Sequence, residues 1–365
     1  MSKAARLFFV SVYALVGIGI VMTYSASAVY AEQVYGYPQY FLVRQACYTL
    51  IGTIALFAVA RIPIEFWKRH ARAIILMSIL MLLLVFLPGI GHTAGGARRW
   101  MHLGPVNFQP TEFAKLAVCL YLADYLSRKA KTIHEGGLRV FLPPFILIGG
   151  ICGISLLQPD LGSCAFIFLL MAFLFFMSGI QARFVIISSL IFLPVIYFLV
   201  IRVPYRLSRV TAYINPWDDP QGSGFQIIQS FLAFGLGGLK GVGLGQSTQK
   251  LFYLPSGYND FIFAVIGEEL GLIGVLVVIL LFGIIFFSGM HMTGRASTLY
   301  EKLLIQSLTF SIVVQALVNM MVATGLLPTK GLPLPFVSYG GTSIVMNLMG
   351  VGLLLGVDLH SRGHR

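Results

Sequence analysis

Residues 254–269 read LPSGYNDFIFAVIGEE, a polar loop that runs directly into an apolar helix and carries three carboxylates. The whole chain has only 13 acidic residues, so this concentration at one membrane surface needs a reason. Asp260 lies at the mouth of the predicted helix, whereas Glu268 and Glu269 lie about 11 to 14 Å along it at 1.5 Å per residue. The segment predicts a helix that starts at a polar outer surface and carries two acids into the membrane.

The composition places this helix in a membrane protein. Hydrophobic residues make up 58% of the 365 residues and charged residues only 10%, which leaves too little polar surface for a soluble globule. A bilayer core of about 30 Å needs roughly 20 apolar residues per helix. We therefore expect an all-α polytopic membrane protein, a bundle of ten transmembrane helices in a single domain over residues 1–365. The predicted spans are approximately 7–29, 41–60, 73–90, 109–126, 140–157, 163–179, 184–203, 261–287, 303–326 and 340–358.

The net charge of +12 is explained by topology. Of the 25 Lys and Arg residues, 15 fall in connections on the side of the termini, 8 on the other side and 2 inside spans. Cytoplasmic loops carry the basic excess in membrane proteins. We therefore expect both termini in the cytoplasm, the long connection 204–260 outside, and no nucleic-acid partner.

The N-terminus resembles a signal peptide, because Lys3 and Arg6 precede an apolar run. That run is longer than the apolar region of about 7 to 15 residues in signal peptides, so we expect a retained first helix. The four cysteines fall inside or at the edge of predicted spans. We expect buried free thiols without a disulfide or metal at Cys47, Cys119, Cys152 and Cys164.

Two outer connections stand out. The segment 91–108 joins Gly-rich turns to Arg98 and Arg99, and the segment 204–260 is longer than a connection requires. Long ordered loops are often functional. Residues 225–234 are apolar but too short to cross a bilayer, so we expect them to lie along the interface or to dip partway into it.

Ionisable side chains inside a bilayer are costly unless paired or hydrated, so each is a functional candidate. Pro110 suits the first turn of the fourth span, in which Glu112 and Lys115 lie three residues apart on one face. A structural ion pair and a functional pair both fit this spacing. Arg44 in the second span can complete a network with them.

Glu268 and Glu269 are adjacent, so their side chains point about 100° apart around the helix and cannot easily share a partner. At least one should meet a cation on another helix or stay protonated. A structural tie is favoured over catalysis, because depth in the membrane hinders contact with a polar substrate.

Asp260 suits the N-cap of the eighth helix, and capping is compatible with catalysis. A positioned carboxylate near an outer cavity can accept the proton of an attacking hydroxyl. Asp160, in the segment 158–162, is expected to cap the sixth helix.

A pool of outer basic side chains can bind phosphate through charge-assisted hydrogen bonds or, alternatively, contact anionic lipid head groups. Its members are Arg98, Arg99, Arg206, Arg209, Lys240, Lys250 and Lys330. Ser338 opens the run 338–343, which starts a helix at Gly340-Gly341. Such an N-terminus can bind an anion, but the run is also a common helix start.

Motif blocks spread in order over the whole chain resemble the SEDS family of shape, elongation, division and sporulation proteins, which includes FtsW, RodA and SpoVE. The version at 328–335 is closer to the division branch than to the elongation branch. The family often has Glu and His where this chain has Ser256 and Tyr258, so a role for that acid and imidazole does not transfer. The matching blocks are 24–27, 96–100, 108–115, 158–162, 215–217, 222–226, 260–271 and 328–343.

The resemblance implies a peptidoglycan glycosyltransferase that polymerises lipid II at the outer face of the bacterial cytoplasmic membrane, for septal wall synthesis in cell division. It equates the family's essential loop aspartate with Asp260. Asp260 is then the catalytic base, and the basic pool together with Ser338 contacts the substrate diphosphate. A divalent cation such as Mg²⁺ or Mn²⁺ can share the diphosphate charge, although its ligands are unknown.

Other functions remain open. An elongation-type polymerase would act on the same substrate, and a scaffold would only position a partner. A lipid II flippase would need a polar path through the membrane, formed by Arg44, Glu112, Lys115, Glu268 and Glu269. The partners that the resemblance implies are lipid II, the lipid-linked glycan strand, a class B penicillin-binding transpeptidase and other cell-division proteins.

Overall fold

The computed structural model describes residues 1–94, 97–104, 106–133, 137–249 and 257–360. This part of the chain is helical apart from one small sheet. Its α-helices are α1 (Lys3–Tyr35), α2 (Tyr40–Arg61), α3 (Ile64–Leu84), α4 (Pro110–Lys129), α5 (Gly137–Leu157), α6 (Leu161–Met177), α7 (Ala182–Ile201), α8 (Pro204–Ile214), α9 (Phe225–Gly237), α10 (Ile262–Thr293), α11 (Leu299–Ala323) and α12 (Gly341–His360). Two short 3-10 helices, η1 (Ala130–Thr132) and η2 (Pro216–Asp218), complete the helical elements.

Each of the ten predicted spans overlaps one long helix, and the two remaining helices, α8 and α9, lie inside the predicted long connection. Among the described residues, seven helices are long and apolar enough to cross a membrane: α1, α2, α5, α7, α10, α11 and α12. Charged side chains in α3 and α4 and the 17-residue length of α6 set those three helices apart. The all-α class is confirmed, and the ten-span topology stays a prediction.

The position predicted for the third span, 73–90, is wrong. α3 begins at Ile64 and ends at Leu84. Its first turns carry Lys68 and Arg69. A search for continuous apolar sequence excludes these residues, but Lys and Arg are good helix formers, so the helix begins before the apolar run. The other boundaries differ from the predicted ones by at most six residues.

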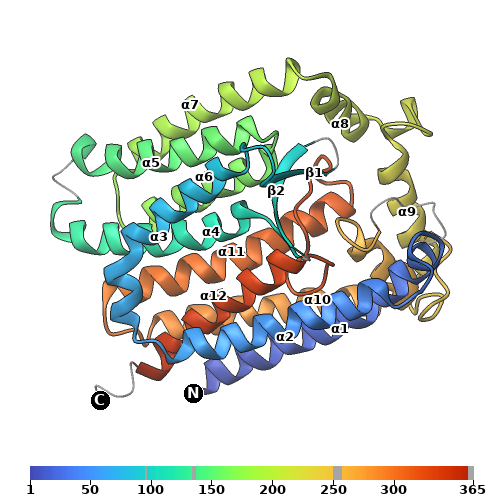
Figure 1. Cartoon of the computed structure of the whole chain (residues 1–365), viewed down its shortest axis with the longest axis horizontal. Coiled ribbons are helices and arrows are strands. Elements are labelled where there is room, and N and C mark those ends of the chain that lie inside the picture. Colours follow the sequence, from blue (N-terminus) through green and yellow to red (C-terminus); the bar gives the residue numbers. More distant parts are fainter. Residues whose placement is uncertain (95–96, 105, 134–136, 250–256, 361–365) are drawn as a thin grey trace.

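The two ends of the described chain meet at one end of the bundle, where the amide of Ser2 donates to the Asp358 carboxylate at 2.7 Å. In Figure 1, α8 and α9 lie at the opposite end, together with the C-terminal end of α1. This arrangement agrees with an even number of crossings. Which end faces the cytoplasm stays a prediction.

The connection 91–108 contains a sheet that the sequence analysis did not predict. Strands β1 (Gly91–Ala94), β2 (Ala97–Leu103) and β3 (Val106–Phe108) pair antiparallel in the order β1-β2-β3. Strands this short leave too weak a period-two pattern to be recognised beside Gly-rich turns. Successive strand residues point to opposite faces, so Arg98 and Arg99 on β2 are directed to different surroundings.

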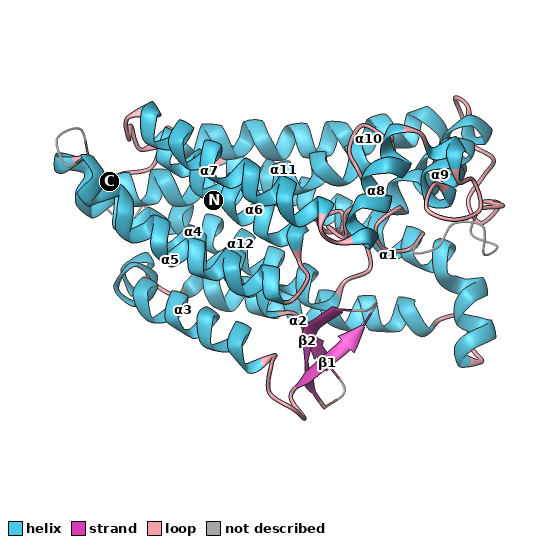
Figure 2. Cartoon of the chain, turned by 90° about the horizontal axis from the view of Figure 1, so that it is seen from above, coloured by secondary structure: helices cyan, strands magenta, loops and turns pink. Residues whose placement is uncertain are grey.

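Glycine allows a close contact between α2 and α12. A Cβ on Gly352 would lie 2.5 Å from the carbonyl oxygen of Leu56, so only glycine fits there without a shift of the backbone. This contact holds α12, which is largely buried, in the middle of the bundle seen in Figure 2. The segment 328–340 that precedes α12 is thereby fixed beside the start of α10.

α10 is interrupted at Gly271, which has φ +66° and ψ −165°. A left-handed conformation favours glycine. The backbone groups released by this break are satisfied by the chain after α9: Val242 N donates to Glu268 O at 2.9 Å, and Leu272 N donates to Gly238 O at 2.9 Å. The first part of α10, residues 262–270, is therefore a short, separately supported helix that follows Asp260.

Candidate active site around Asp260

Asp260 lies in the turn of residues 257–261 that leads into α10. The expectation that it caps this helix is wrong, because Phe261 occupies the N-cap position and no side chain caps the helix there. Asp260 is partly buried and lies one residue outside the cap. Its carboxylate is thus not committed to the first turn of α10.

The backbone of this turn is held at three successive carbonyls, each by a different donor. Tyr339 N donates to Tyr258 O at 3.0 Å, Ser338 Oγ to Asn259 O at 2.7 Å, and Asn319 Nδ2 to Asp260 O at 2.9 Å. Buried carbonyls held in this way have little freedom to move. The fold therefore fixes the position from which the Asp260 side chain projects.

Ser338, expected among the substrate contacts, lies inside this support. It is 4% exposed, and its hydroxyl also accepts a hydrogen bond from Leu334 N at 2.8 Å. The Ser338 hydroxyl thus uses its one O–H donor and one of its two acceptor lone pairs within the protein. The structure gives Ser338 a role in holding the turn, and direct contact with substrate stays a prediction.

Tyr258 stands where the resemblance to the SEDS family implies a His, and its ring joins an aromatic cluster. The ring centroid lies 4.7 Å from that of Phe41 on α2, 5.8 Å from that of Tyr30 on α1 and 6.1 Å from that of Tyr339. Burial raises the pKa of the Tyr258 hydroxyl to about 12, so it does not replace an imidazole as a base near neutral pH. Ser256 lies outside the described residues.

The surroundings of Asp260 favour its neutral form without preventing ionisation. Burial raises the pKa of its carboxyl to about 6, and the charges of Arg209 and Arg99 oppose this rise. No N–H or O–H of the described residues donates to the carboxylate oxygens. Asp260 is therefore an ionisable acid that is unpaired in this part of the chain and titrates near the working range of a general base.

Arg99 reaches this site from β2 and is held by the turn before α6. Its Nε donates to Gln158 O at 3.2 Å and its Nη2 to Pro159 O at 2.5 Å, and its Nη1 lies 4.0 Å from the Asp160 carboxylate. A guanidinium has five N–H donors, so part of its capacity remains for an anion. The expectation that Asp160 caps α6 is confirmed, since it accepts from Ser163 N at 3.1 Å.

Arg209 reaches the site from α8. Its Nη1 donates to Thr329 O at 3.2 Å, and its Nη2 bonds the Tyr205 hydroxyl. Lys330 is the next residue after Thr329, and burial lowers the pKa of its ammonium. A Cβ on Gly331 would lie 3.6 Å from Asp260 Oδ2, so this segment forms a wall beside the carboxylate.

The remaining members of the basic pool lie elsewhere or have other partners. Arg98 Nη2 donates to Leu87 O at 2.7 Å, and Arg206 Nη1 donates to Leu199 O at 3.2 Å. Lys240 adjoins Gly241, whose backbone packs against Glu269 O at the break in α10. Lys250 lies outside the described residues. The structure thus singles out three of the seven expected cations: Arg99, Arg209 and Lys330.

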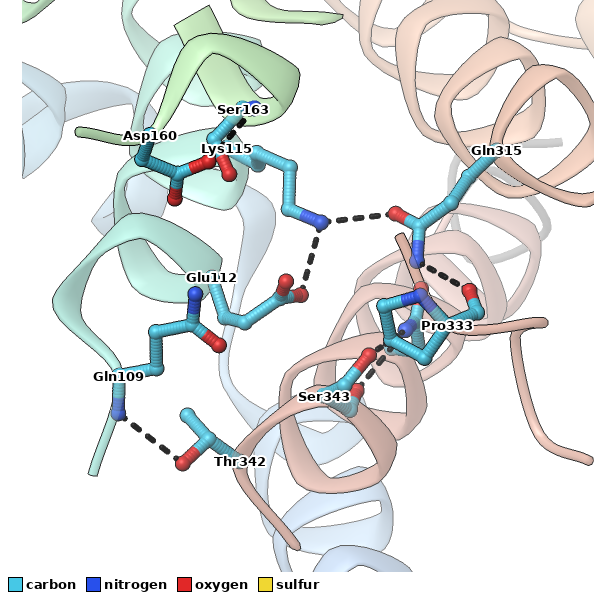
Figure 3. Close-up of polar contacts among 10 residues, drawn as sticks. Gln109, Glu112, Lys115, Asp160, Ser163, Gln315, Pro333, Thr342 and Ser343 are labelled. Carbon is cyan, nitrogen blue, oxygen red and sulfur yellow. Dashed lines mark hydrogen bonds and ion pairs between the residues drawn. The ribbon is translucent and has the colours of Figure 1, made fainter. Parts of the chain in front are cut away.

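The intramembrane ion pair is confirmed, and it extends further than expected. Lys115 Nζ lies 2.8 Å from Glu112 Oε2 and donates to Gln315 Oε1 at 2.7 Å, and Gln315 Nε2 donates to Pro333 O at 2.9 Å (Figure 3). A water-sized cavity of about 20 Å³ adjoins the pair. The charges of α4 therefore connect to the segment that lines the Asp260 site.

Arg44 does not complete this network, so that expectation is wrong. Its guanidinium lies 4.6 Å from the centre of the Tyr40 ring and hydrogen bonds the side chain of Tyr339. Tyr40, at the N-terminal end of α2, offers it a cation–π contact, and no ion pair joins it to Glu112 among the described residues.

Glu268 and Glu269 share a partner, which corrects the expectation that they could not. Ser247 Oγ bonds Glu268 Oε2 while Ser247 N donates to Glu269 Oε1 at 3.4 Å. Thr248 donates twice to Glu268, and Ser25 Oγ on α1 lies 2.6 and 2.7 Å from the two Glu269 oxygens. The loop 246–249 lies between the two side chains, so a difference of about 100° around the helix does not separate their partners.

The predicted burial is confirmed for three of the four cysteines. All four thiols are free, but Cys47 is exposed on α2, while Cys119, Cys152 and Cys164 are buried. The exposed face of α2 explains Cys47, since an apolar thiol is compatible with a lipid-facing surface.

Two supporting residues were missed by the sequence analysis: Asn319 and Gln315. Both are 1% exposed and lie four residues apart on α11. Uncharged amides in an apolar helix do not stand out when only ionisable side chains are counted. Their spacing on one face was the available signal.

A family model described as cell cycle protein, FTSW_RODA_SPOVE, matches residues 5–363. A Geobacter sulfurreducens protein named "Probable peptidoglycan glycosyltransferase FtsW" is 43% identical over 350 residues, which cover 96% of this chain and 94% of that protein. Stage V sporulation protein E of Bacillus subtilis is 40% identical over 348 residues, which cover 95% of each.

Solved structures share the fold. A chain from a peptidoglycan synthase complex that coordinates polymerization and crosslinking superimposes with a TM-score of 0.79 at 28% identity, covering 97% of each chain. The rod shape determining protein RodA of Thermus thermophilus superimposes with a TM-score of 0.70 at 25% identity, covering 96% of this chain and 95% of that one.

Proposed function

The chain belongs to the FtsW, RodA and SpoVE family of cell cycle proteins, and from that premise we propose that it is a peptidoglycan glycosyltransferase of the FtsW type. It polymerises lipid II into glycan strands at the outer face of the bacterial cytoplasmic membrane and serves the septal wall in cell division. Support comes from relatives named for this activity over nearly the full length of the chain, and from the fold shared with a peptidoglycan synthase complex.

The mechanism rests on the Asp260 carboxylate. The backbone of Asp260 is held by a hydrogen bond, while none of the described residues donates to its carboxylate oxygens. Asp260 accepts the proton of the glucosamine 4-hydroxyl of one lipid II. That oxygen forms a bond to the muramyl anomeric carbon of the lipid-linked strand. The bond from this carbon to the lipid diphosphate breaks, and the configuration at the carbon is inverted.

The departing diphosphate needs positive charge at the place where its own charge develops. Arg99, Arg209 and Lys330 serve this purpose, because the first two act electrostatically on Asp260 and the third adjoins the wall beside it. Arginine suits this task because its planar guanidinium binds phosphate oxygens in pairs. Arg98, Arg206 and Lys240 are secondary in this scheme.

A divalent cation such as Mg²⁺ or Mn²⁺ would fit this site through one or two carboxylates only. No group of three or more His, Cys, Asp or Glu side chains gathers to hold a metal in the described part of the chain. The unpartnered Asp160 Oδ2 would supply one ligand, and phosphate oxygens of the substrate and water would complete the coordination. A bound cation would share the charge of the diphosphate.

The proposal requires ten membrane spans with both termini in the cytoplasm, so that Asp260 faces outward. The excess of basic residues in the connections on the side of the termini supports this orientation. The connection between α7 and α10 then lies outside, and its helix α8 brings Arg209 to the site.

The partner in the proposal is a class B penicillin-binding transpeptidase, which crosslinks the strands that this chain polymerises. The shared fold with a chain of a complex that coordinates polymerization and crosslinking supports such an assembly. Other cell-division proteins complete the set of partners.

The test is polymerisation of lipid II by purified protein. Asp260→Asn and Asp260→Ala should abolish it while expression stays near normal, because the acceptor proton then has no base. Full activity in either variant would end the assignment of Asp260.

A lipid II flippase remains a separate prediction. Its polar path would join Arg44, Glu112, Lys115, Glu268 and Glu269, which the structure distributes over three separate sets of contacts. A reconstituted flipping assay beside the polymerisation assay distinguishes the two, and transport that survives loss of Asp260 would favour the flippase.

A further inference from the structure

α11 carries Gln315 and Asn319 on one face, with both side chains 1% exposed. A buried amide is unfavourable unless it is hydrogen bonded, so each side chain needs partners inside the protein. Both amides use their donors on backbone carbonyls of the segments that form the Asp260 site. α11 is thus linked to the site at two points one helical turn apart.

Asn319 joins the two walls of the site. Its Nδ2 donates to Asp260 O and to Leu332 O, each at 2.9 Å. Leu332 directly follows Gly331, whose Cα lies beside the Asp260 carboxylate. One side chain therefore fixes both the backbone of the acid and the segment that faces its oxygens.

Gln315 holds the next carbonyl along the same segment, Pro333 O, at 2.9 Å. Its orientation is determined by its partners, since Lys115 can only donate and a carbonyl can only accept. Oε1 must therefore face Lys115, and Nε2 must face Pro333, as Figure 3 shows. Lys115 is in turn fixed by Glu112 at 2.8 Å.

These contacts form one continuous network from α4, through α11, to the turn of Asp260. We propose that Gln315 and Asn319 are positioning residues for Asp260, and that the buried Glu112–Lys115 pair orients Gln315 for this task. The inference rests on the proposed function, because positioning matters only if Asp260 acts on a substrate.

Loss of Asn319 should release the turn and its facing wall, and loss of Gln315 should loosen the wall and, through it, the turn. Asp260 then moves toward water, its burial decreases and its pKa falls from about 6 toward about 4, the ordinary value of an aspartate. A displacement of about 1 Å at a reacting group can cost up to about 10²-fold in rate. Substrate binding, which depends on the outer cations, should change little.

The experiment compares purified Asn319→Ala and Gln315→Ala with the wild type, with Gln306→Ala as the matched control. Gln306 is an amide on the same helix, outside the network. The readouts are kcat and KM for lipid II, the acid limb of the pH profile, the thermal midpoint, and hydrogen exchange of a peptide that contains residues 257–261.

For Asn319→Ala we expect kcat to fall about 10-fold to 10²-fold, with KM within about threefold and an acid limb that moves down toward pH 4. Gln315→Ala should show the same pattern to a smaller degree, and Gln306→Ala should match the wild type. Hydrogen exchange in residues 257–261 should accelerate in both network variants.

The inference fails if, in both network variants, the acid limb of the pH profile and the hydrogen exchange of residues 257–261 match the wild type. This holds even if activity falls, provided that the thermal midpoint falls with it. It also fails if Gln306→Ala shows the same shifts. A wild type that makes no polymer would refute the proposed function, and the exchange data would then still decide whether the two amides hold the turn.

Discussion

Two acidic regions at the start of α10 lie eight residues apart and differ in how their carboxylates are satisfied. Glu268, which is fully buried, accepts hydrogen bonds from the hydroxyl of Ser247 and from the amide and hydroxyl of Thr248. Among the described residues, Asp260 is held through its backbone carbonyl alone, and its carboxylate is acted on by the charges of Arg99 and Arg209. Both regions are fixed in place, but within this part of the chain the Asp260 oxygens accept no hydrogen bond.

This difference teaches how a structural acid can be told from a catalytic one. A carboxylate whose oxygens already accept several hydrogen bonds has few lone pairs left to receive a proton from a substrate. A desolvated carboxylate without donors has a raised pKa and can accept a proton from a substrate. Burial alone does not separate the two, since both regions are enclosed.

After Asp260 itself, the arginines are expected to give the largest effect. Arg99→Ala or Arg209→Ala should lower kcat by about 10-fold to 10²-fold, since a hydrogen bond to a charged group contributes about 1.5 to 3 kcal/mol. Arg98→Ala is the matched control, because Arg98 is the neighbour of Arg99 on β2 and donates to Leu87 O instead. Polymerisation rates of the purified variants provide the measurement. An Arg98→Ala loss as large as that of Arg99→Ala would place the diphosphate elsewhere.

The pH dependence should follow Asp260. Its pKa is raised to about 6, and the base acts only when ionised, so kcat/KM should fall about tenfold per pH unit below 6 and level off above 7. A rate profile between pH 5 and 8 provides the test. An acid limb near pH 4 would mean that the group is not desolvated.

The raised pKa of Asp260 also affects the stability of the fold, and its effect has the opposite sign from that of a salt-bridged acid. Because the pKa of folded Asp260 lies above the unfolded value near 4, the folded state binds more protons between about pH 4 and 6. Its contribution therefore becomes less favourable as pH rises through this range. Asp260→Asn should be at least as stable as the wild type at pH 7.

Glu268→Gln should mainly affect stability. The substitution replaces one carboxylate oxygen by an NH2 group, so the donors of either Ser247 or Thr248 lose their acceptor, at about 1 to 3 kcal/mol for each buried group left unpaired. We expect a lower thermal midpoint in detergent, while the rate per folded molecule stays within about threefold. A loss of rate with an unchanged midpoint would make Glu268 a participant in the reaction.

The smallest effect is expected at Tyr258. Tyr258→His restores the family's common residue and keeps an aromatic ring against Phe41 and Tyr30. We expect a change in rate within about threefold, which is less than about 1 kcal/mol. A rise of more than tenfold would show that the imidazole supplies chemistry that this chain lacks.

The sequence was sufficient for the all-α class and for the approximate positions of the long helices. Ten apolar stretches identified the long helices, since hydropathy responds directly to the bilayer as a solvent. It missed the sheet at 91–108 and the break at Gly271, which depend on local backbone geometry and on the chain after α9. The start of α3 was missed because Lys68 and Arg69 belong to the same helix as its apolar part.

For the site, the sequence supplied candidates but not their arrangement. Arg99 and Arg209 were two of seven equivalent cations, and only the fold brings β2 and α8 to the same aspartate. Ser25 lies in the motif block 24–27, but only the structure shows that its hydroxyl on α1 donates to Glu269 on α10. Long-range contacts of this kind leave no local pattern in one sequence.

The most direct measurement sets the two acids side by side: lipid II polymerisation by purified wild type, Asp260→Asn and Glu268→Gln at pH 7.5, with each rate divided by the folded fraction of the same sample. The account predicts no detectable polymer from Asp260→Asn and a near-normal rate per folded molecule from Glu268→Gln. Polymer from Asp260→Asn at the wild-type rate, or its loss only in Glu268→Gln, would contradict it.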